Sequence, residues 1–210
     1  MRGRVDTSEH FRRPAMHLHE AEWGFMSFAN VKISRYRTES AAVNKVLRYI
    51  KGAYEQELPP HYDPPYLERR VDDPAMHIRI EFAPGEILPN TVTQPYVNKC
   101  IDDILYQIGA LGFPYLALTH DRQDQWTNTE SSIHIITRRN MPGTLIEPYS
   151  AEVAIHDLCQ QYNQVRGWDT HYREGSAEML RLTYRESVLR PITPPRDSDS
   201  PKRSKYAMER

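Results

Sequence analysis

The chain has little of what builds a cross-linked or membrane-bound protein. Its 210 residues include two cysteines, Cys100 and Cys159; both lie in segments with helical periodicity, so we expect buried thiols and no disulfide. No apolar run approaches the length that crosses a bilayer, which predicts that a membrane is not among its partners. The opening residues lack the apolar segment of a secretory signal, so we expect a cytoplasmic protein.

Net charge is also small. A formal charge of -1 provides no overall attraction to a phosphate backbone, so nucleic-acid binding would need local basic patches. Two such patches are candidates: Arg48 with Lys51 in a helical segment, and Arg138 with Arg139 after a strand. A solvated surface would explain each patch as well. A Walker loop, a Cys-rich zinc framework and a Ser-His-Asp spacing are all missing, so no rival enzyme class is indicated.

The length suits one domain with a core large enough to fold without cross-links. Residues 1–24 are polar and unpatterned, so we expect a flexible N-terminal arm there. We expect residues 25–189 to form the folded domain. The proline-rich, charged residues 190–210 predict a disordered tail.

Apolar periodicity within the domain alternates between strand and helix. Two-residue alternation or short β-rich runs predict strands at 25–34, 76–82, 115–119 and 133–137. Helical spacing predicts helices from Thr38 or Ser40 to Gly52, and at 95–110, 151–166 and 178–189. This order predicts an α+β fold, with an open, mainly antiparallel sheet and helices packed on one face.

One face of this sheet should collect polar side chains. Side chains alternate across a strand, so the following residues are expected to share a face: His77, Arg79, Glu81, His120, Ser132 and His134. Two imidazoles on paired strands, with Asp121 beside one of them, form the start of a divalent-metal site that needs one or two more ligands. The alternative is that each strand histidine is a hydrogen-bonded structural residue.

A tyrosine near such a metal has a specific chemical use. A phosphodiester repels nucleophiles, and a divalent ion on a nonbridging oxygen offsets that repulsion while a tyrosine attacks. Tyr49 is expected at the border between core and solvent, near the end of its helix. Tyr54 and Tyr36 are fallback candidates, and an ordinary helix-border aromatic is the alternative for Tyr49.

The order of several short motifs resembles a known family. The motifs are LRYIKG around Tyr49, MHIRIEFAPGE at 76–86, ALTHD at 117–121, SIHII at 132–136 and TLIEPYSAEVAIHDLC at 144–159. Together they are similar to conjugative plasmid relaxases of the MOB-P group, in the HUH endonuclease superfamily. The similarity spans roughly residues 26–170.

The resemblance implies a metal-dependent relaxase that nicks single-stranded DNA at the transfer origin of a plasmid or mobile element. It implies that Tyr49 forms a covalent phosphotyrosine link and that Asp121 is the acid of the family's HD pair. His120 and His134 would hold Mg²⁺ or Mn²⁺. Accessory mobilisation proteins are implied as further partners.

Two positions depart from the family pattern. Ser132 stands where the family has the first histidine of its HxH motif, and Glu81 stands where it has a serine. Glu81 or His77 could complete an altered metal site, since carboxylates suit hard ions such as Mg²⁺ and Mn²⁺. Otherwise the site has decayed, and the fold serves only to bind DNA or mobilisation partners. A third possibility is an unrelated α+β protein whose histidines are structural.

Overall fold

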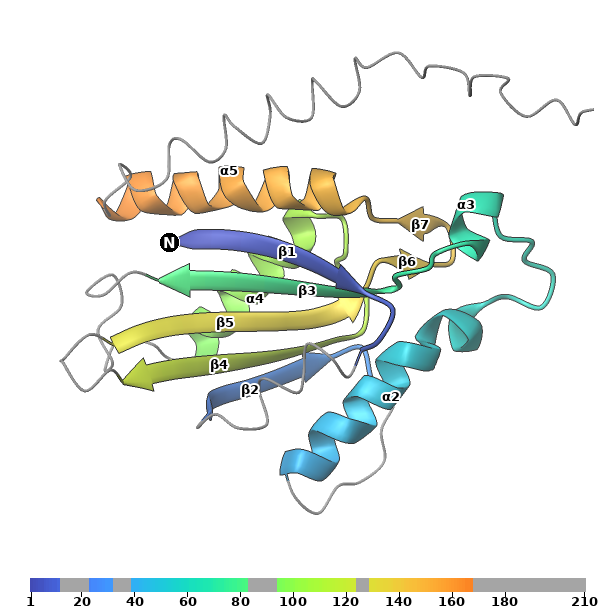
Figure 1. Ribbon diagram of the computed structural model, residues 1–210, viewed down its shortest axis with the longest axis horizontal. Coiled ribbons are helices and arrows are strands. Elements are labelled where there is room, and N and C mark those ends of the chain that lie inside the picture. The colour runs from blue at the N-terminus through green and yellow to red at the C-terminus, as the bar shows by residue number, and fades with distance from the viewer. Residues whose placement is uncertain (12–22, 32–38, 83–93, 124–128, 168–210) are drawn as a thin grey trace, which may run out of the picture.

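The protein is built around a five-stranded antiparallel sheet of order β1-β3-β5-β4-β2 (Figure 1). The computed structural model describes residues 1–11, 23–31, 39–82, 94–123 and 129–167. The sheet strands are β1 (Arg2–Ser8), β2 (Trp23–Ala29), β3 (Ala75–Phe82), β4 (Tyr115–Gln123) and β5 (Thr129–Arg138). The helices are α2 (Glu39–Glu57), α3 (Tyr66–Arg69), α4 (Gln94–Gln107) and α5 (Pro148–Arg166), and β6 (Asn140–Met141) with β7 (Thr144–Leu145) forms a small hairpin. The predicted class, α+β with an open antiparallel sheet, is confirmed.

Strict alternation along β3 places its apolar side chains in the main core. Met76, Ile78, Ile80 and Phe82 are buried, whereas His77 on the opposite face is partly exposed. Helices α4 and α5 supply the other side of this core, and Figure 1 shows α5 running along β1 while α4 crosses behind the strands. The apolar stripe predicted for the helix over 95–110 is confirmed by the burial of its members, Val97, Ile101, Ile104 and Leu105 in α4 and Ile108 directly after it.

Helix α2 packs on the opposite face of the sheet from α4. Its buried residues Val43, Val46 and Ile50 share a second apolar cluster with Leu118 and Ile136 of the sheet. Ile133 and Ile135 of β5 point to the other face and belong to the core beneath α4 and α5. Helices therefore lie on both faces, which differs from the expected single helical layer. Helix α2 covers one end of the second face and leaves a polar region at the other.

The expectation of a flexible arm over residues 1–24 is wrong for β1. This strand pairs antiparallel with β3 over its full length, and Gly3 lies directly against Ile155 and Cys159 of α5. Its inward positions are Gly3 and Val5, and a glycine adds no apolar signal to a sequence pattern. The sequence of β1 therefore has the polar character of a surface segment. The predicted helix over 178–189 and the predicted tail over 190–210 lie outside the described residues.

The segment after α2 is more ordered than its prolines suggest. Gly52 does not end α2, which continues to Glu57 because Ala53 and Tyr54 are buried in the next turn. In the following segment, the buried Glu68 of α3 accepts a hydrogen bond of 2.9 Å from the Tyr62 hydroxyl. The backbone N–H of Gly143 donates to the same hydroxyl at 2.6 Å. These bonds fasten the segment to the β6–β7 hairpin.

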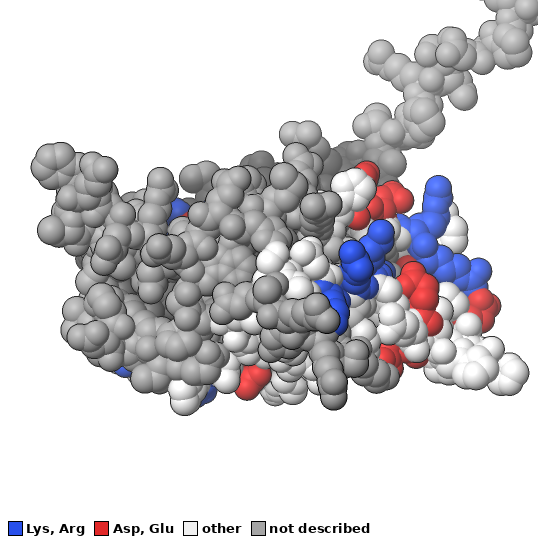
Figure 2. All heavy atoms as spheres, turned by 90° about the horizontal axis from the view of Figure 1, so that it is seen from below, with Lys and Arg blue, Asp and Glu red and all other residues white. Residues whose placement is uncertain are grey.

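Basic side chains on the surface are interspersed with acidic ones. Figure 2 shows the Lys and Arg atoms of the lower side gathered on the right, where Figure 1 places α2 and α3, with Asp and Glu among them. Lys45, Arg48 and Lys51 recur every three residues along the exposed side of α2.

None of the described helices is long and apolar enough to span a membrane.

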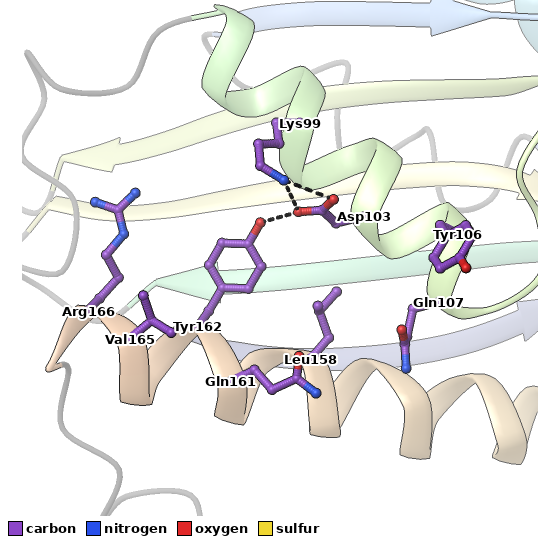
Figure 3. Close-up of a pocket in the computed structure, with 9 residues that line it drawn as sticks. All are labelled: Lys99, Asp103, Tyr106, Gln107, Leu158, Gln161, Tyr162, Val165 and Arg166. Atoms are coloured by element: carbon purple, nitrogen blue, oxygen red, sulfur yellow. Dashed lines mark hydrogen bonds and ion pairs between the residues drawn. The ribbon is translucent and has the colours of Figure 1, made fainter.

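A cavity of about 440 Å³ lies between α4 and α5, with a polar bridge beside it (Figure 3). The Tyr162 hydroxyl of α5 donates to Asp103 Oδ2 of α4 at 2.5 Å, and Lys99 Nζ donates to the same oxygen at 2.8 Å. Burial and the bond to Asp103 raise the pKa of Tyr162 above its ordinary value. Nearby Cys100 is buried, and burial raises the pKa of its thiol. Both cysteines are buried and neither is in a disulfide, as predicted.

Candidate metal and nucleic-acid site on the open sheet face

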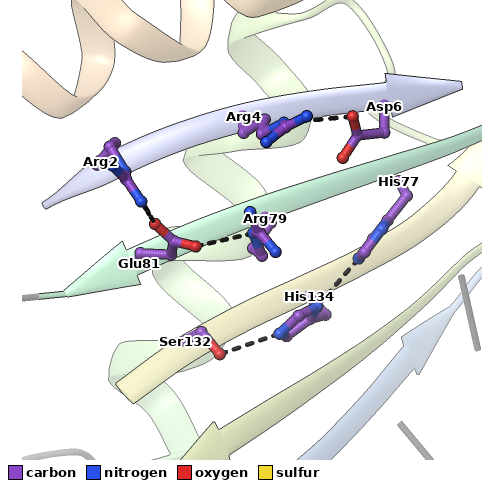
Figure 4. Close-up of polar contacts among 8 residues, drawn as sticks. All are labelled: Arg2, Arg4, Asp6, His77, Arg79, Glu81, Ser132 and His134. Atoms are coloured by element: carbon purple, nitrogen blue, oxygen red, sulfur yellow. Dashed lines mark hydrogen bonds and ion pairs between the residues drawn. The ribbon is translucent and has the colours of Figure 1, made fainter. Parts of the chain in front are cut away.

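Polar side chains from three strands share the part of the sheet that α2 leaves uncovered (Figure 4). The register of β3 against β5 pairs Arg79 with His134 and Glu81 with Ser132. The expectation that these groups share one face is confirmed for the residues whose side chains are described.

His134 is held by hydrogen bonds at both ring nitrogens. Its Nδ1 lies 3.0 Å from His77 Nε2, and its Nε2 lies 3.0 Å from Ser132 Oγ. The two imidazole rings stack with their centroids 5.2 Å apart and their planes 20° from parallel. In the bond between the rings, one nitrogen must donate and the other accept, so the two facing nitrogens share a single proton.

The same spacing is compatible with two ligands of one metal ion. Two nitrogen ligands at right angles, each about 2.1 Å from an ion, lie about 3.0 Å apart. His77 Nε2 and His134 Nδ1 already have this separation, and a bound cation would replace the proton between them. The separation of the two nitrogens is therefore compatible with two ligands of one ion, and both rings would have to turn from their shared hydrogen bond toward that ion.

Glu81 is less suited to ligate that ion. Its Oε2 forms an ion pair with Arg2, and its Oε1 lies 2.9 Å from Arg79 Nε. A metal would have to displace two guanidinium groups from this carboxylate. Of the two groups expected to complete an altered site, His77 is the better placed.

His120 and Asp121 are described by their backbone alone. The register of β4 against β5 places His120 opposite Ser132 and Leu118 opposite His134, so His120 lies two register positions further along the face than His134. Asp121 is opposite Ser131. No group of three possible metal ligands is found among the side chains that the structure describes. A shared metal at His120 and His134 stays a prediction.

Tyr49 has its ring in the core and its hydroxyl toward the surface. The residue is 8% exposed, and its hydroxyl donates to Glu57 Oε1 at 3.2 Å. This is the border position that the sequence predicts. Tyr54, the fallback candidate, is equally buried; its hydroxyl has no hydrogen-bond partner among the described residues, and burial raises its pKa. Tyr36 lies outside the described residues.

Arg138 has a structural environment, which corrects its expected role at the surface. It is 5% exposed, and its guanidinium donates to Asn140 Oδ1 at 2.9 Å and to the backbone carbonyl of Lys51. The rings of Phe11 and Tyr54 lie on it at 5.5 and 5.6 Å. Burial lowers the pKa of this guanidinium, although it remains a cation. Arg138 is thus engaged in joining β5 to α2 and is not positioned to meet a phosphate.

Arg139 is similarly occupied. Its Nη1 pairs with Asp73, and its Nε donates to the Ile146 carbonyl at 3.2 Å. Arg48 and Lys51 differ, because both are exposed on α2 and remain available to a nucleic acid. Half of the predicted phosphate contacts are therefore accessible.

The sequence interpretation missed the contribution of β1 to this face. Arg2, Arg4 and Asp6 extend the polar surface beyond Arg79 and Glu81, in direct register with β3. The signal was the alternation of charged residues with Gly3 and Val5, which has the period of a strand but only one apolar member.

Comparisons of the chain with protein-family models, with curated proteins and with solved structures return no match.

Proposed function

We propose that the protein is a relaxase-like enzyme that nicks single-stranded DNA at a transfer origin and forms a covalent link through Tyr49. The observation that carries the proposal is the His77–His134 contact on the polar face that α2 leaves uncovered, two register positions from His120. This arrangement is what a metal-assisted attack on a phosphodiester would use.

His134 and His120 would hold Mg²⁺ or Mn²⁺, with His77 in place of the missing histidine at Ser132. A divalent ion bound there supplies positive charge beside a nonbridging phosphate oxygen. Asp121 follows His120 directly and would be the acid of the HD pair, as the resemblance implies.

Tyr49 would act as the nucleophile. Its hydroxyl loses a proton, its oxygen bonds to phosphorus, and the bond from phosphorus to one sugar oxygen breaks; that oxygen takes up a proton and leaves as a sugar hydroxyl. Glu57 Oε1 accepts the hydrogen bond of this hydroxyl and could accept that proton. The tyrosine oxygen must leave Glu57 as the DNA enters, so substrate binding and movement at the end of α2 are coupled in this proposal.

The second candidate is a relaxase-like protein that binds DNA or mobilisation partners without cutting. Three features favour it: Ser132 replaces a histidine, two arginines hold Glu81, and Tyr49 is largely buried. This reading needs no metal and no movement of Tyr49.

A covalent-adduct assay separates the two. The protein is incubated with a library of labelled single-stranded oligonucleotides and Mg²⁺ or Mn²⁺, and bound label is scored on a denaturing gel. An adduct that needs the metal and disappears in Tyr49→Phe and His134→Ala supports the enzyme. Tyr66→Phe is the matched control, because Tyr66 is 64% exposed on α3 and should leave the adduct unchanged.

Tyr49→Phe keeps the buried ring, so the variant should fold, which circular dichroism checks. No adduct from any sequence, together with DNA binding that persists in EDTA, would reject nicking in favour of the second candidate. An adduct that survives Tyr49→Phe would move the nucleophile to another residue.

A further inference from the structure

Arg4, Arg79 and His134 form one row across three adjacent strands. The register pairs Arg4 of β1 with Arg79 of β3, and pairs Arg79 with His134 of β5. Figure 4 shows Arg4 and Arg79 side by side on their strands, with His134 next in line. Neighbouring strands are about 4.8 Å apart, so the row runs about 10 Å from the edge of the sheet to the histidine.

The placement of two arginines directly opposite each other is unfavourable for the isolated protein. Like charges in directly opposed positions of an antiparallel pair destabilise a sheet. Two acids offset this: Asp6 Oδ1 lies 3.3 Å from Arg4 Nε, and Glu81 pairs with Arg79. With Arg2 included, β1 and β3 carry three arginines and two acids among their described side chains on this face, so one positive charge there is left without a matching acid.

The arginines in the row are only partly satisfied by these acids. The Arg4 side chain is 60% exposed and the Arg79 side chain is 33% exposed, so both present N–H groups to solvent. The Nε atom of Arg79 is buried and makes no hydrogen bond of good geometry, even though Glu81 Oε1 is 2.9 Å away. The exposed parts of these two guanidinium groups suit the bidentate recognition of phosphate.

We propose that this row is a phosphate track, in which Arg4 and Arg79 bind successive phosphates of a single DNA strand and lead it across β1 and β3 to His134. This inference rests on the proposed function, and it adds the direction from which the strand approaches. The DNA crosses the sheet perpendicular to the strands and enters over the β1 edge. Asp6 and Glu81 occupy the arginines until phosphates displace them, which keeps the free protein from holding other anions tightly.

The test measures fluorescence anisotropy of a labelled oligothymidine with the full chain, repeated over a range of potassium chloride concentrations. Each lost phosphate contact reduces the slope of log affinity against log salt by about 0.7 for a single strand. Arg4→Gln and Arg79→Gln should each reduce the slope by about that amount and weaken binding severalfold. Asp6→Asn should do the opposite at low salt and tighten binding, because Arg4 loses its competing acid.

A matched control pair joins α3 to the segment before it. Arg69 is 48% exposed and pairs with the exposed Asp63, so its chemistry resembles that of Arg4 and Asp6 at a place off the open face. Arg69→Gln and Asp63→Asn should leave affinity and slope at wild-type values. Thermal unfolding of each variant checks that the fold is intact.

The two proposals fail in different ways. DNA binding with wild-type slopes in Arg4→Gln, Arg79→Gln and Asp6→Asn would overturn the phosphate track and leave the proposed function standing. Equal losses in the Arg69→Gln control would also overturn it, since the effect would then reflect overall charge. If the wild-type chain binds no single-stranded DNA at low salt, the proposed function and the track are both rejected.

Discussion

Glu81 and Ser132 are register partners across β3 and β5, and the carboxylate of Glu81 turns to Arg2 and Arg79. Ser132 in turn faces His120 across β5 and β4. Ser132, where the resembling family has a histidine, therefore lies between two residues. On one side is Glu81, whose carboxylate is paired with arginines, and on the other is the backbone of His120, a predicted metal ligand. A ligand restored at Ser132 would complete the set without disturbing Glu81.

Ser132→His should therefore strengthen metal binding. We expect the affinity for Mn²⁺ to rise by about tenfold or more, comparable to the effect of partners that orient metal ligands. Isothermal titration calorimetry of wild type and variant measures the change. Ser40→His is the control, because Ser40 is exposed at the start of α2 and should add no affinity. Equal Mn²⁺ affinity in all three proteins would remove the case for a metal at this face.

Arg138 should matter for stability and not for DNA contact. Arg138→Met leaves the Lys51 carbonyl and the Asn140 side chain without their charged donor. We expect the free energy of unfolding to fall by about 2–4 kcal/mol, measured by urea denaturation. Arg48→Met, on the exposed side of α2, should change it by less than about 0.5 kcal/mol. A stable Arg138→Met variant with weakened DNA affinity would show that this guanidinium reaches phosphate after all.

Elements with strong apolar periodicity could be predicted from the sequence. Met76 to Phe82 alternates, and the stripe from Val97 to Ile108 has helical spacing; both are buried as expected. Strand β1 could not be predicted, because its burial at Gly3 comes from a close approach of α5 and not from an apolar side chain. Gly52 was expected to end its helix, but α2 continues past Gly52 because Tyr54 is buried in the next turn.

The candidate site was predictable only in part, for a similar reason. Alternation along β3 and β5 places His77 and His134 on one face, but their contact depends on register, which a sequence pattern does not specify. The pair Arg138 and Arg139 looks like a surface patch in sequence. In the fold, β6 and α2 close over Arg138, and nothing local to these residues signals that burial.

Two glycine substitutions should have opposite effects. Gly3→Ala places a methyl group against Ile155 Cγ2 of α5, so α5 or β1 must shift, and we expect a loss of about 1–3 kcal/mol. Gly52→Ala meets only the flexible end of Gln56 within α2, and the higher helix propensity of alanine should stabilise the protein by about 0.5–1 kcal/mol. Thermal and urea unfolding compare both with wild type. A neutral Gly3→Ala would mean that β1 does not pack under α5.

Asp103 should contribute stability at neutral pH that is lost in acid. Burial opposes its charge, but hydrogen bonds from Lys99 and Tyr162 outweigh burial and lower its pKa below the ordinary value near 3.8. Because the folded-state pKa is lower than the unfolded one, this contribution is present above pH 3.8 and disappears as the pH falls through the lowered pKa. Asp103→Asn should flatten this acidic part of the curve of unfolding free energy against pH.

Tyr162 should impose the opposite dependence in alkali. Burial and the bond to Asp103 raise its pKa above the ordinary value of 10, so above pH 10 the unfolded chain loses this proton more readily than the folded one. Ionisation then favours unfolding, and stability should fall as the pH rises above 10. Tyr162→Phe removes one such proton, which should reduce the slope of unfolding free energy with pH by at most about 1.4 kcal/mol per pH unit. Some dependence should remain, because burial raises the pKa of Tyr96 to about 12.

The Tyr162 prediction separates its ionisation from its packing. At neutral pH, Tyr162→Phe loses the bond to Asp103 and should be less stable by about 1 kcal/mol. Between pH 10 and 11 this deficit should shrink, because only the wild-type protein has the Tyr162 proton to lose on unfolding. Urea unfolding of wild type and variant at matched pH values measures the difference, and Tyr106→Phe, on the exposed side of α4, is the control. A deficit that stays constant with pH would mean that the α4–α5 bridge stabilises the fold through packing alone.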